Sequence, residues 1–432
     1  MSTDPVVNKP SLRVGTARID ITPESPIRLC GYASRTTPNE GVEQPIVAAA
    51  LAFQPAGQPP VLLISVEVTA IPATLTERLA KRLAERADLP RERFVLACTH
   101  THGAPCVTGA LPNMFGRAIP EAHTEAIERY TQTLFERLER IALSALAQME
   151  PATLYCNQGR ATFGANRRTE GGPVDPSLPV LVARSRDGRP LAIVVNYACH
   201  CTTLRGLNRV NGDWAGQARQ QIEAMYPGAV ALITLGFAGD INPSPRGELE
   251  HAQEYGQRVA SEVERLLADQ MVALRRGPVC GVTRLTLPFE RIPDRAEWER
   301  RAGEEGAVGY HARQFLALLD RGGSIPEALD YPVQVWSFGR DLTMVFLAGE
   351  VVIDYALRLK AEHPNHRLWL TAYANDVPCY IPSVRVLREG GYEPDTSNLY
   401  YGQPNRLAES IEDKIVGAVR ALIEAADARV QS

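Results

Sequence analysis

The sequence predicts an α/β fold: one large domain built on a mixed central β-sheet flanked by helices. Short runs rich in Val, Ile, Leu and aromatic residues alternate along the chain with longer amphipathic patterns of helical period. No long linker rich in Pro, Gly or Ser, no internal repeat and no low-complexity tract divides the chain. At 432 residues the chain is long enough to bury a large core. We therefore expect residues 1–432 to form a single domain.

The expected strands are short and apolar, and most have Gly, Pro, Asn or Asp close by. In chain order they are Arg13–Ile21, Ile46–Phe53, Val61–Val66, Phe94–Cys98, Val180–Ala183, Ala192–Tyr197, Val230–Leu235, Pro278–Leu287, Val333–Phe338, Leu342–Leu347 and Leu368–Tyr373.

The expected helices lie between these strands, where apolar residues recur every three or four positions. They are Thr74–Ala87, Glu121–Ala147, Ala215–Tyr226, Glu248–Leu267, Ala296–Leu319 and Asn405–Ala426. Residues 291–331 form the most polar stretch of the chain, and we interpret them as a helical insertion or cap within the domain.

The charge balance excludes several classes of partner. The chain has 46 Lys and Arg against 50 Asp and Glu, so it lacks the basic excess that drives binding to nucleic acid or anionic lipid.

No apolar run approaches the roughly 18 residues of a membrane span, and the start, Met1–Pro10, lacks the apolar segment of a secretory signal. We expect a cytoplasmic protein with a small-molecule substrate, no nucleic-acid partner and no stable membrane insertion. Homo-oligomer formation stays open.

Residue usage and missing motifs narrow the chemistry further. Only four lysines are present (Lys9, Lys81, Lys360 and Lys414), which argues against Schiff-base chemistry in the middle of the chain. The sequence has no phosphate-binding loop, no dinucleotide-binding Gly-x-Gly-x-x-Gly and no Gly-x-Ser-x-Gly nucleophile elbow. The eight cysteines include no Cys-x-x-Cys pair and are expected to be buried thiols.

Two histidines follow an apolar run at the point where a strand should leave the core. They are His100 and His102, in the segment Cys98–Pro105. If the chain stays extended there, both imidazoles project from the same face, because side chains alternate along a strand. One can then bind a metal while the other acts as a base. A structural histidine with satisfied hydrogen bonds is the alternative.

A third histidine and a glutamate interrupt other buried runs. His200 closes the run Ile193–Leu204, where Cys199 and Cys201 should point to the opposite face and pack in the core; a zinc site containing cysteine is the alternative. Glu350 lies in an otherwise apolar run, and burying a carboxylate is costly unless it is paired or bound to a metal. A salt-bridged or capping Glu350 is the competing interpretation. The other histidines are expected to be solvated: His123, His251, His311, His363 and His366.

These segments, taken in order along the chain, resemble the zinc-bearing N-terminal catalytic domain of the neutral/alkaline (non-lysosomal) ceramidase family. The residues that carry the resemblance are Val14-Gly-x-Ala-x-x-Asp-Ile-Thr22, Gly31-Tyr32, Thr99-His-Thr-His102, Asn166-Arg167, Ala198-Cys-His200, Gly212-Asp213, Gly239-Asp240, Gly349-Glu350, Tyr373-Ala-Asn375, Tyr380 and Tyr392.

The resemblance implies a zinc cofactor and assigns roles to individual residues. The implied zinc ligands are His100, His200, Glu350 and Tyr380. His102 is implied to lie beside a metal-activated water as the proton acceptor. Arg167 and Tyr392 are implied to line the reacting carbonyl. Asp240 and Asn242, in the turn Gly236–Pro243 after an expected strand, are expected to bind the substrate.

Two departures from the family pattern bear on the substrate. Asn242 stands where the ceramidases carry a serine, and asparagine can donate a hydrogen bond but cannot act as a hydroxyl nucleophile. The C-terminal sandwich domain usual in secreted ceramidases is also not expected here. We therefore expect a zinc-dependent hydrolase of an amide (N-acyl) bond, related to the ceramidases but acting on another substrate. The alternatives are a zinc hydrolase of a lactone, ester or glycoside, and a non-catalytic zinc-stabilised binding protein.

Overall fold

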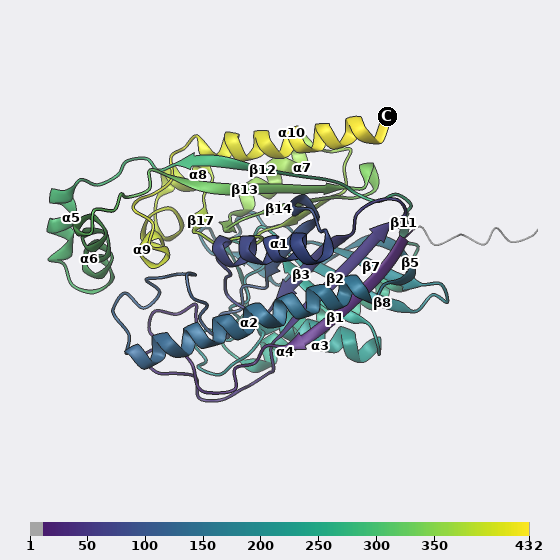
Figure 1. Cartoon of the computed structure of the whole chain (residues 1–432), viewed down its shortest axis with the longest axis horizontal. Coiled ribbons are helices and arrows are strands. Elements are labelled where there is room, and N and C mark those ends of the chain that lie inside the picture. The colour runs from purple at the N-terminus through teal and green to yellow at the C-terminus, as the bar shows by residue number, and fades with distance from the viewer. Residues whose placement is uncertain (1–11, 432) are drawn as a thin grey trace, which may run out of the picture.

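A large mixed β-sheet forms the centre of the protein in the computed structural model, which describes residues 12–431 (Figure 1). The segment Met1–Pro10 lies outside the described residues. The strands, in spatial order, are β4 (Phe94–Cys98), β3 (Val61–Val66), β2 (Val47–Pro55), β1 (Leu12–Asp20), β5 (Glu150–Arg160), β7 (Ser177–Ser185), β8 (Pro190–Tyr197) and β9 (Val230–Leu235), with β11 (Val272–Leu274) paired to β5. The outermost pairs β3–β4 and β8–β9 are parallel, and the pairs between them are antiparallel. The predicted α/β class is confirmed.

A second sheet packs against one face of the first. It consists of β12 (Val279–Pro288), β13 (Ala328–Ser337), β14 (Thr343–Leu347) and β16 (Leu368–Thr371). Large apolar side chains from both sheets share one buried cluster, in which Phe53 of β2 meets Trp336 of β13 with ring centroids 6.3 Å apart. Alternating side chains on facing strands fill this layer, as in other packed sheet pairs.

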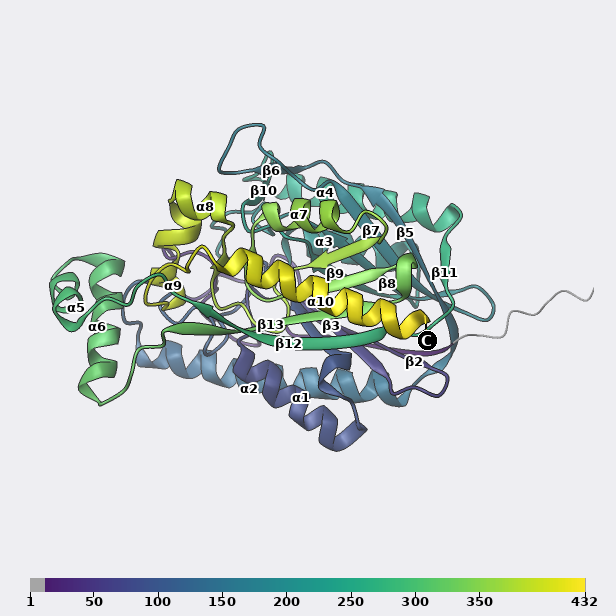
Figure 2. The ribbon, with the colours of Figure 1, turned by 90° about the horizontal axis from the view of Figure 1, so that it is seen from above.

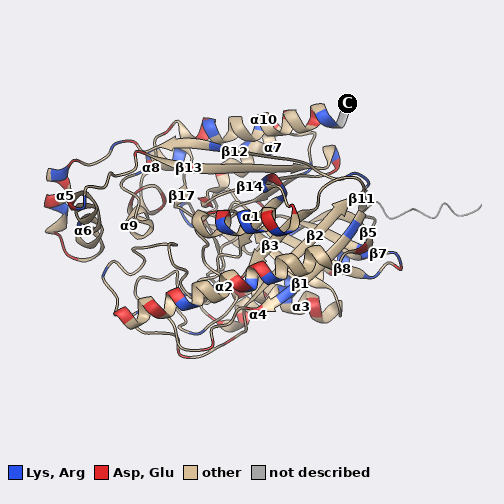
Figure 3. Cartoon of the chain, viewed as in Figure 1, with Lys and Arg blue, Asp and Glu red and all other residues tan. Residues whose placement is uncertain are grey.

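Helices cover the outer faces, so the molecule is layered (Figures 1 and 2). The large sheet carries α1 (Ala73–Ala87), α2 (Glu121–Ala147), α3 (Asp213–Met225) and α4 (Leu249–Ala268). Over the second sheet lie α10 (Ile411–Gln431), which contacts β12 and β13, and α7 (Ile353–Glu362). Charged residues mark the outer sides of these helices (Figure 3), as the amphipathic patterns predict.

A helical hairpin between β12 and β13 projects beyond the sheets at the left of Figure 1. It replaces the single helix expected over Ala296–Leu319 with α5 (Arg295–Ala302) and α6 (Gly306–Asp320), separated around Gly303. Trp298, Ala312 and Phe315 give the hairpin a small core of its own.

His311 belongs to this core and is buried, so the expectation that it is solvated was wrong. Burial is possible because its Nε2–H donates to the carbonyl of Gln403 over 2.8 Å.

Short elements complete the fold. They are β6 (Gly164–Asn166) paired with β10 (Ile241–Pro243), β15 (Glu350–Val351) paired with β17 (Tyr380–Ile381), α8 (Val384–Glu389), a π-helical turn (Tyr392–Thr396), α9 (Asn398–Tyr401) and the 3₁₀ turns Arg91–Arg93 and Gly339–Asp341. Among residues 12–431, no helix has both the length and the apolar character that crossing a membrane requires.

Candidate metal centre and its pocket

A four-residue segment, 372–375, joins the ends of several strands and so creates the candidate site. The N–H of Ala372 donates to the carbonyl of Leu235, at the end of β9, and the N–H of Cys98, at the end of β4, donates to the carbonyl of Tyr373. Tyr373 and Ala374 donate in turn to Gly349 and Leu347, where β14 ends. The loops that leave β4, β9 and β14, which are far apart in the sequence, are therefore held next to one another.

His100 enters this junction from the loop after β4. Its backbone is left-handed, with a φ of +52°, so the extended chain expected here is wrong. Its Nδ1 lies 2.6 Å from the carbonyl oxygen of Thr69. Because a carbonyl can only accept, Nδ1 carries the hydrogen and Nε2 of the neutral ring keeps its lone pair. The ring of Tyr373 stacks on His100 with centroids 4.4 Å apart, which fixes the plane of the imidazole.

His200, after β8, is held in the same way from the other side. Its Nδ1 lies 2.6 Å from the carbonyl oxygen of Ala238, so this ring also directs an Nε2 lone pair into the junction. The flanking Cys199 and Cys201 are fully buried core residues, as expected from their alternation with His200.

Glu350 brings a carboxylate between the two histidines. Its Oε2 lies 3.2 Å from Nε2 of His100 and 2.8 Å from Nε2 of His200. The residue before it, Gly349, has a φ of +75°, and a Cβ there would lie 2.6 Å from the carbonyl oxygen of Cys379, so only glycine fits this turn. Burial alone would raise the pKa of Glu350, but a proton shared with the two imidazoles places positive charge and an N–H donor beside the carboxylate and holds that pKa well below its usual range.

These three groups fit a divalent cation. Two imidazole nitrogens whose lone pairs face a buried carboxylate oxygen form a cluster of acceptors, which is stable only with a proton or a cation between them. Imidazole nitrogen and carboxylate oxygen are typical zinc donors, and tetrahedral zinc holds such donors about 3.3 Å apart. The observed separations of 3.2 and 2.8 Å are close to that spacing.

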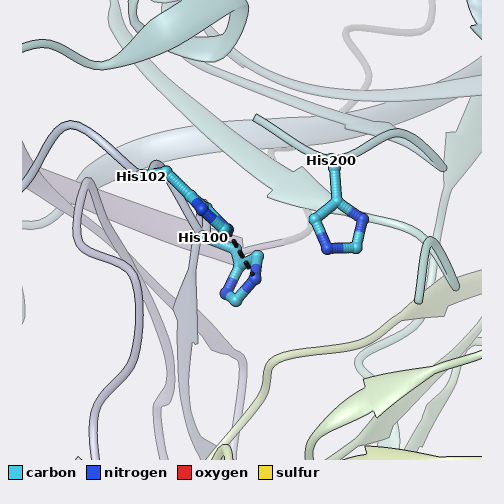
Figure 4. A group of neighbouring side chains, drawn as sticks. All are labelled: His100, His102 and His200. Carbon is cyan, nitrogen blue, oxygen red and sulfur yellow. Dashed lines mark hydrogen bonds between the residues drawn. The ribbon is translucent and has the colours of Figure 1, made fainter. Parts of the chain in front are cut away.

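His102 lies beside the same cluster and is partly exposed to the pocket (Figure 4). Its Nε2 is 3.2 Å from Nε2 of His100, and the ligand nitrogens of His100, His102 and His200 all lie within 4.8 Å of one another. Burial lowers the pKa of His102 well below its usual value, and the neighbouring imidazoles lower it further. A neutral imidazole in this position can accept a proton.

Tyr380 and Arg167 form a wall of the pocket that His102 also lines. Tyr380 is opposite Glu350 in the β15–β17 pair, and its hydroxyl accepts a hydrogen bond from Nη2 of Arg167 over 3.0 Å. Arg167 is also held by Glu393, through a contact of 2.8 Å at Nε, and its guanidinium faces the ring of Tyr392 at 5.6 Å. Tyr392 is 45% exposed at the edge of this wall.

A pocket of about 680 Å³ opens onto these residues. His102, Arg167, Tyr380, Tyr392 and Asn242 all line it. Asp240 does not. Its carboxylate is buried and accepts from the N–H of Ile353, the first residue of α7, and from the side-chain amide of Asn166 in β6, so it supports these two elements. Its contact with a substrate stays a prediction.

Two residues of the site could not be found from the sequence. Tyr401 donates a short hydrogen bond to Oε1 of Glu350, the oxygen that does not face the histidines. Glu393 accepts from both Arg167 and Arg168, and thus positions the arginine wall. Both residues follow Tyr392 in a stretch without apolar periodicity, and only their contacts across the fold identify them.

Comparisons with known proteins identify the fold. No protein-family model matches the sequence, and no curated protein matches it. Among solved structures, a neutral ceramidase from Pseudomonas aeruginosa is similar over 98% of this chain and 74% of its own, with a TM-score of 0.73 and 18% identity. A ceramidase complexed with C2 is similar over 98% of this chain and 76% of its own, with a TM-score of 0.74 and 18% identity. The chain therefore shares its fold with these ceramidases.

Proposed function

We propose that the protein is a zinc-dependent hydrolase that cleaves an amide (N-acyl) bond of a small or lipid-like substrate. The observation that carries the proposal is the set of acceptors at the junction: the Nε2 atoms of His100 and His200 face Oε2 of Glu350 at 3.2 and 2.8 Å. The fold shared with structures described as ceramidases supports the same chemistry. Fold alone does not define activity, so the site has to carry the argument.

In this proposal His100, His200 and Glu350 hold the zinc ion, and Tyr380, which faces the same junction, is its fourth protein ligand. A zinc ion bound there supplies Lewis-acid chemistry, lowering the pKa of a water molecule toward about 7 and polarising a carbonyl group. The carbonyls of Thr69 and Ala238 keep both imidazoles in the tautomer that leaves Nε2 free for a metal.

The proton transfers fall to His102. Its Nε2 faces the cluster, so it can accept a proton from the attacking water and return it to the leaving amine. Arg167 and Tyr392 line the same pocket and are the donors for the oxygen on which negative charge develops. Asn242 offers an amide to orient the substrate, in the position of the ceramidase serine.

His102→Ala tests this function directly. The purified wild type should hydrolyse members of a panel of N-acyl substrates, and the variant should lose about 10²- to 10⁴-fold in kcat, because general acid–base catalysis contributes on that scale. The zinc content of the variant should stay that of the wild type. His251→Ala, on α4 and outside the pocket, is the matched control. Normal turnover by His102→Ala would overturn the assignment of the base. A wild type that cleaves lactones, esters or glycosides but no amide would overturn the assignment of the bond.

A further inference from the structure

The pocket wall contains three arginines, of which only two are neutralised. Arg167 and Arg168 both donate to the carboxylate of Glu393, and Arg168 also reaches Glu389 over 3.1 Å. The third, Arg246, lines the same pocket but makes no hydrogen bond or ion pair within residues 12–431. A positive charge on a concave wall without a counter-charge favours a negatively charged ligand.

A second arginine, Arg205, lies near the backbone that carries Arg246. Nε of Arg205 is 3.8 Å from the point that a Cβ on Gly247 would occupy, and Gly247 directly follows Arg246. Arg205 is exposed and, within the described part of the chain, also has no carboxylate partner. The charges of both arginines reach Tyr32 in the pocket: burial raises the pKa of Tyr32 to about 12, while Arg246 and Arg205 lower it. Two positive charges that act on the same part of the pocket favour the binding of an anion there.

The backbone that carries Arg246 is fixed. On one side, the carbonyl of Pro245 accepts from the hydroxyl of Tyr255 over 2.5 Å. On the other, the N–H of Gly247 donates to the carbonyl of Thr203 over 2.7 Å. Binding through a side chain on a fixed backbone costs less conformational entropy than binding through a mobile loop.

We propose that the substrate carries an anionic group, a carboxylate, sulfate or phosphate, that Arg246 binds with the help of Arg205. This inference rests on the proposed function and specifies its substrate class. A guanidinium binds such groups through two parallel hydrogen bonds, which adds direction to the charge attraction. Arg246 shares the pocket with His102 and Asn242, so a molecule held by its anionic end presents its other groups to the candidate catalytic residues.

Phosphate binding tests the anion site independently of hydrolysis. The full-length protein is titrated with inorganic phosphate by calorimetry at constant ionic strength, before and after treatment with a chelator. Binding should survive chelation, weaken by about tenfold or more in Arg246→Gln, as expected for the loss of charge-assisted hydrogen bonds, and stay unchanged in Arg186→Gln. Arg186, in the exposed turn between β7 and β8, is the matched control. Thermal melts of both variants verify that they fold.

Two outcomes overturn the anion site: wild type that does not bind phosphate, and Arg246→Gln that binds it as well as wild type does. Binding that disappears on chelation while Arg246→Gln binds normally would place the phosphate on a metal, which also overturns the proposal.

Matched amides then test whether this site selects the substrate. Each anionic amide is compared with the neutral compound in which a carboxamide replaces its carboxylate. The anionic amides are 4-acetamidobenzoate, whose charge is on the amine side, and succinanilate, whose charge is on the acyl side. The anionic member of at least one pair should have a kcat/KM about tenfold higher, mainly through KM, and Arg246→Gln should abolish that preference. Equal rates within both pairs would overturn the substrate class. Failure of the wild type to cleave any amide would instead refute the proposed function, and the phosphate titration would still decide the anion site.

Discussion

The Nδ1 atoms of His100 and His200 are each occupied by a backbone carbonyl, at 2.6 Å in both cases. This arrangement determines which nitrogen is free, and it comes from the chain's own turns rather than from a ligand. Two free Nε2 atoms and one carboxylate oxygen then meet at a single point. Because all three atoms are hydrogen-bond acceptors, none of them can donate to another, and a shared proton or cation is needed between them.

Tyr401 provides a residue-scale prediction. Its hydroxyl donates to Oε1 of Glu350, which leaves Oε2 for the histidines. Tyr401→Phe removes this hydrogen bond and frees the carboxylate to rotate, so the zinc affinity should fall about 10- to 100-fold, as expected when an outer-shell partner is lost. Competition with a chelator of known affinity measures the change, and Tyr310→Phe on α6 is the control. An unchanged zinc affinity in Tyr401→Phe would show that the tyrosine does not position the carboxylate.

At the scale of single elements, the sequence predicted best where apolar residues form a long run or follow the helical period. Helix α2 was predicted with its observed bounds, because its apolar side chains follow the helical period and the segment begins after Pro120. Strand β5 was not predicted. Its sequence has no run of Val, Ile and Leu and contains the adjacent polar residues Asn157 and Gln158, and its pairing with β1, β7 and β11 comes from distant parts of the chain.

The hairpin α5–α6 gives a prediction about pH. Burial lowers the pKa of His311 to about 4, although its hydrogen bond to Gln403 acts in the opposite direction. An unfolded histidine has a pKa near 6.5, so the unfolded state binds the proton first and stability falls as pH drops from about 6.5 to about 4. At pH 5 this single group should cost about 2 kcal/mol of unfolding free energy relative to pH 7.

His311→Gln tests this value, because glutamine can donate to the same carbonyl but does not titrate. Urea unfolding of both proteins at pH 7 and pH 5 should give a loss of stability that is smaller in the variant by about 2 kcal/mol. Equal losses in the two proteins would show that His311 does not remain neutral in the folded state.

At the scale of the whole molecule, the candidate site joins four parts of the chain. His100, His200 and Glu350 follow β4, β8 and β14, and segment 372–375 bridges the ends of β4, β9 and β14. The sequence could mark these residues as unusual, because each interrupts or closes an apolar run. It could not show that they meet, since hydrogen bonds such as those from Cys98 to Tyr373 and from Ala372 to Leu235 link residues more than a hundred positions apart.

A cation held by all of these loops should therefore stabilise the protein as a whole. Zinc added at about 100 times its dissociation constant should raise the free energy of unfolding by about 2.7 kcal/mol if it binds only the folded state. The melting temperature of chelator-treated protein should rise on adding zinc, and the same addition should leave His200→Ala unchanged. A similar rise in both proteins would indicate that zinc binds elsewhere.

The most direct measurement of the central claim is the zinc content of the purified protein by plasma mass spectrometry, made side by side on wild type, His200→Ala and His251→Ala. The account predicts about one zinc per chain in the wild type and in His251→Ala, and almost none in His200→Ala. No stoichiometric zinc in the wild type after zinc is resupplied, or full zinc in His200→Ala, would contradict it.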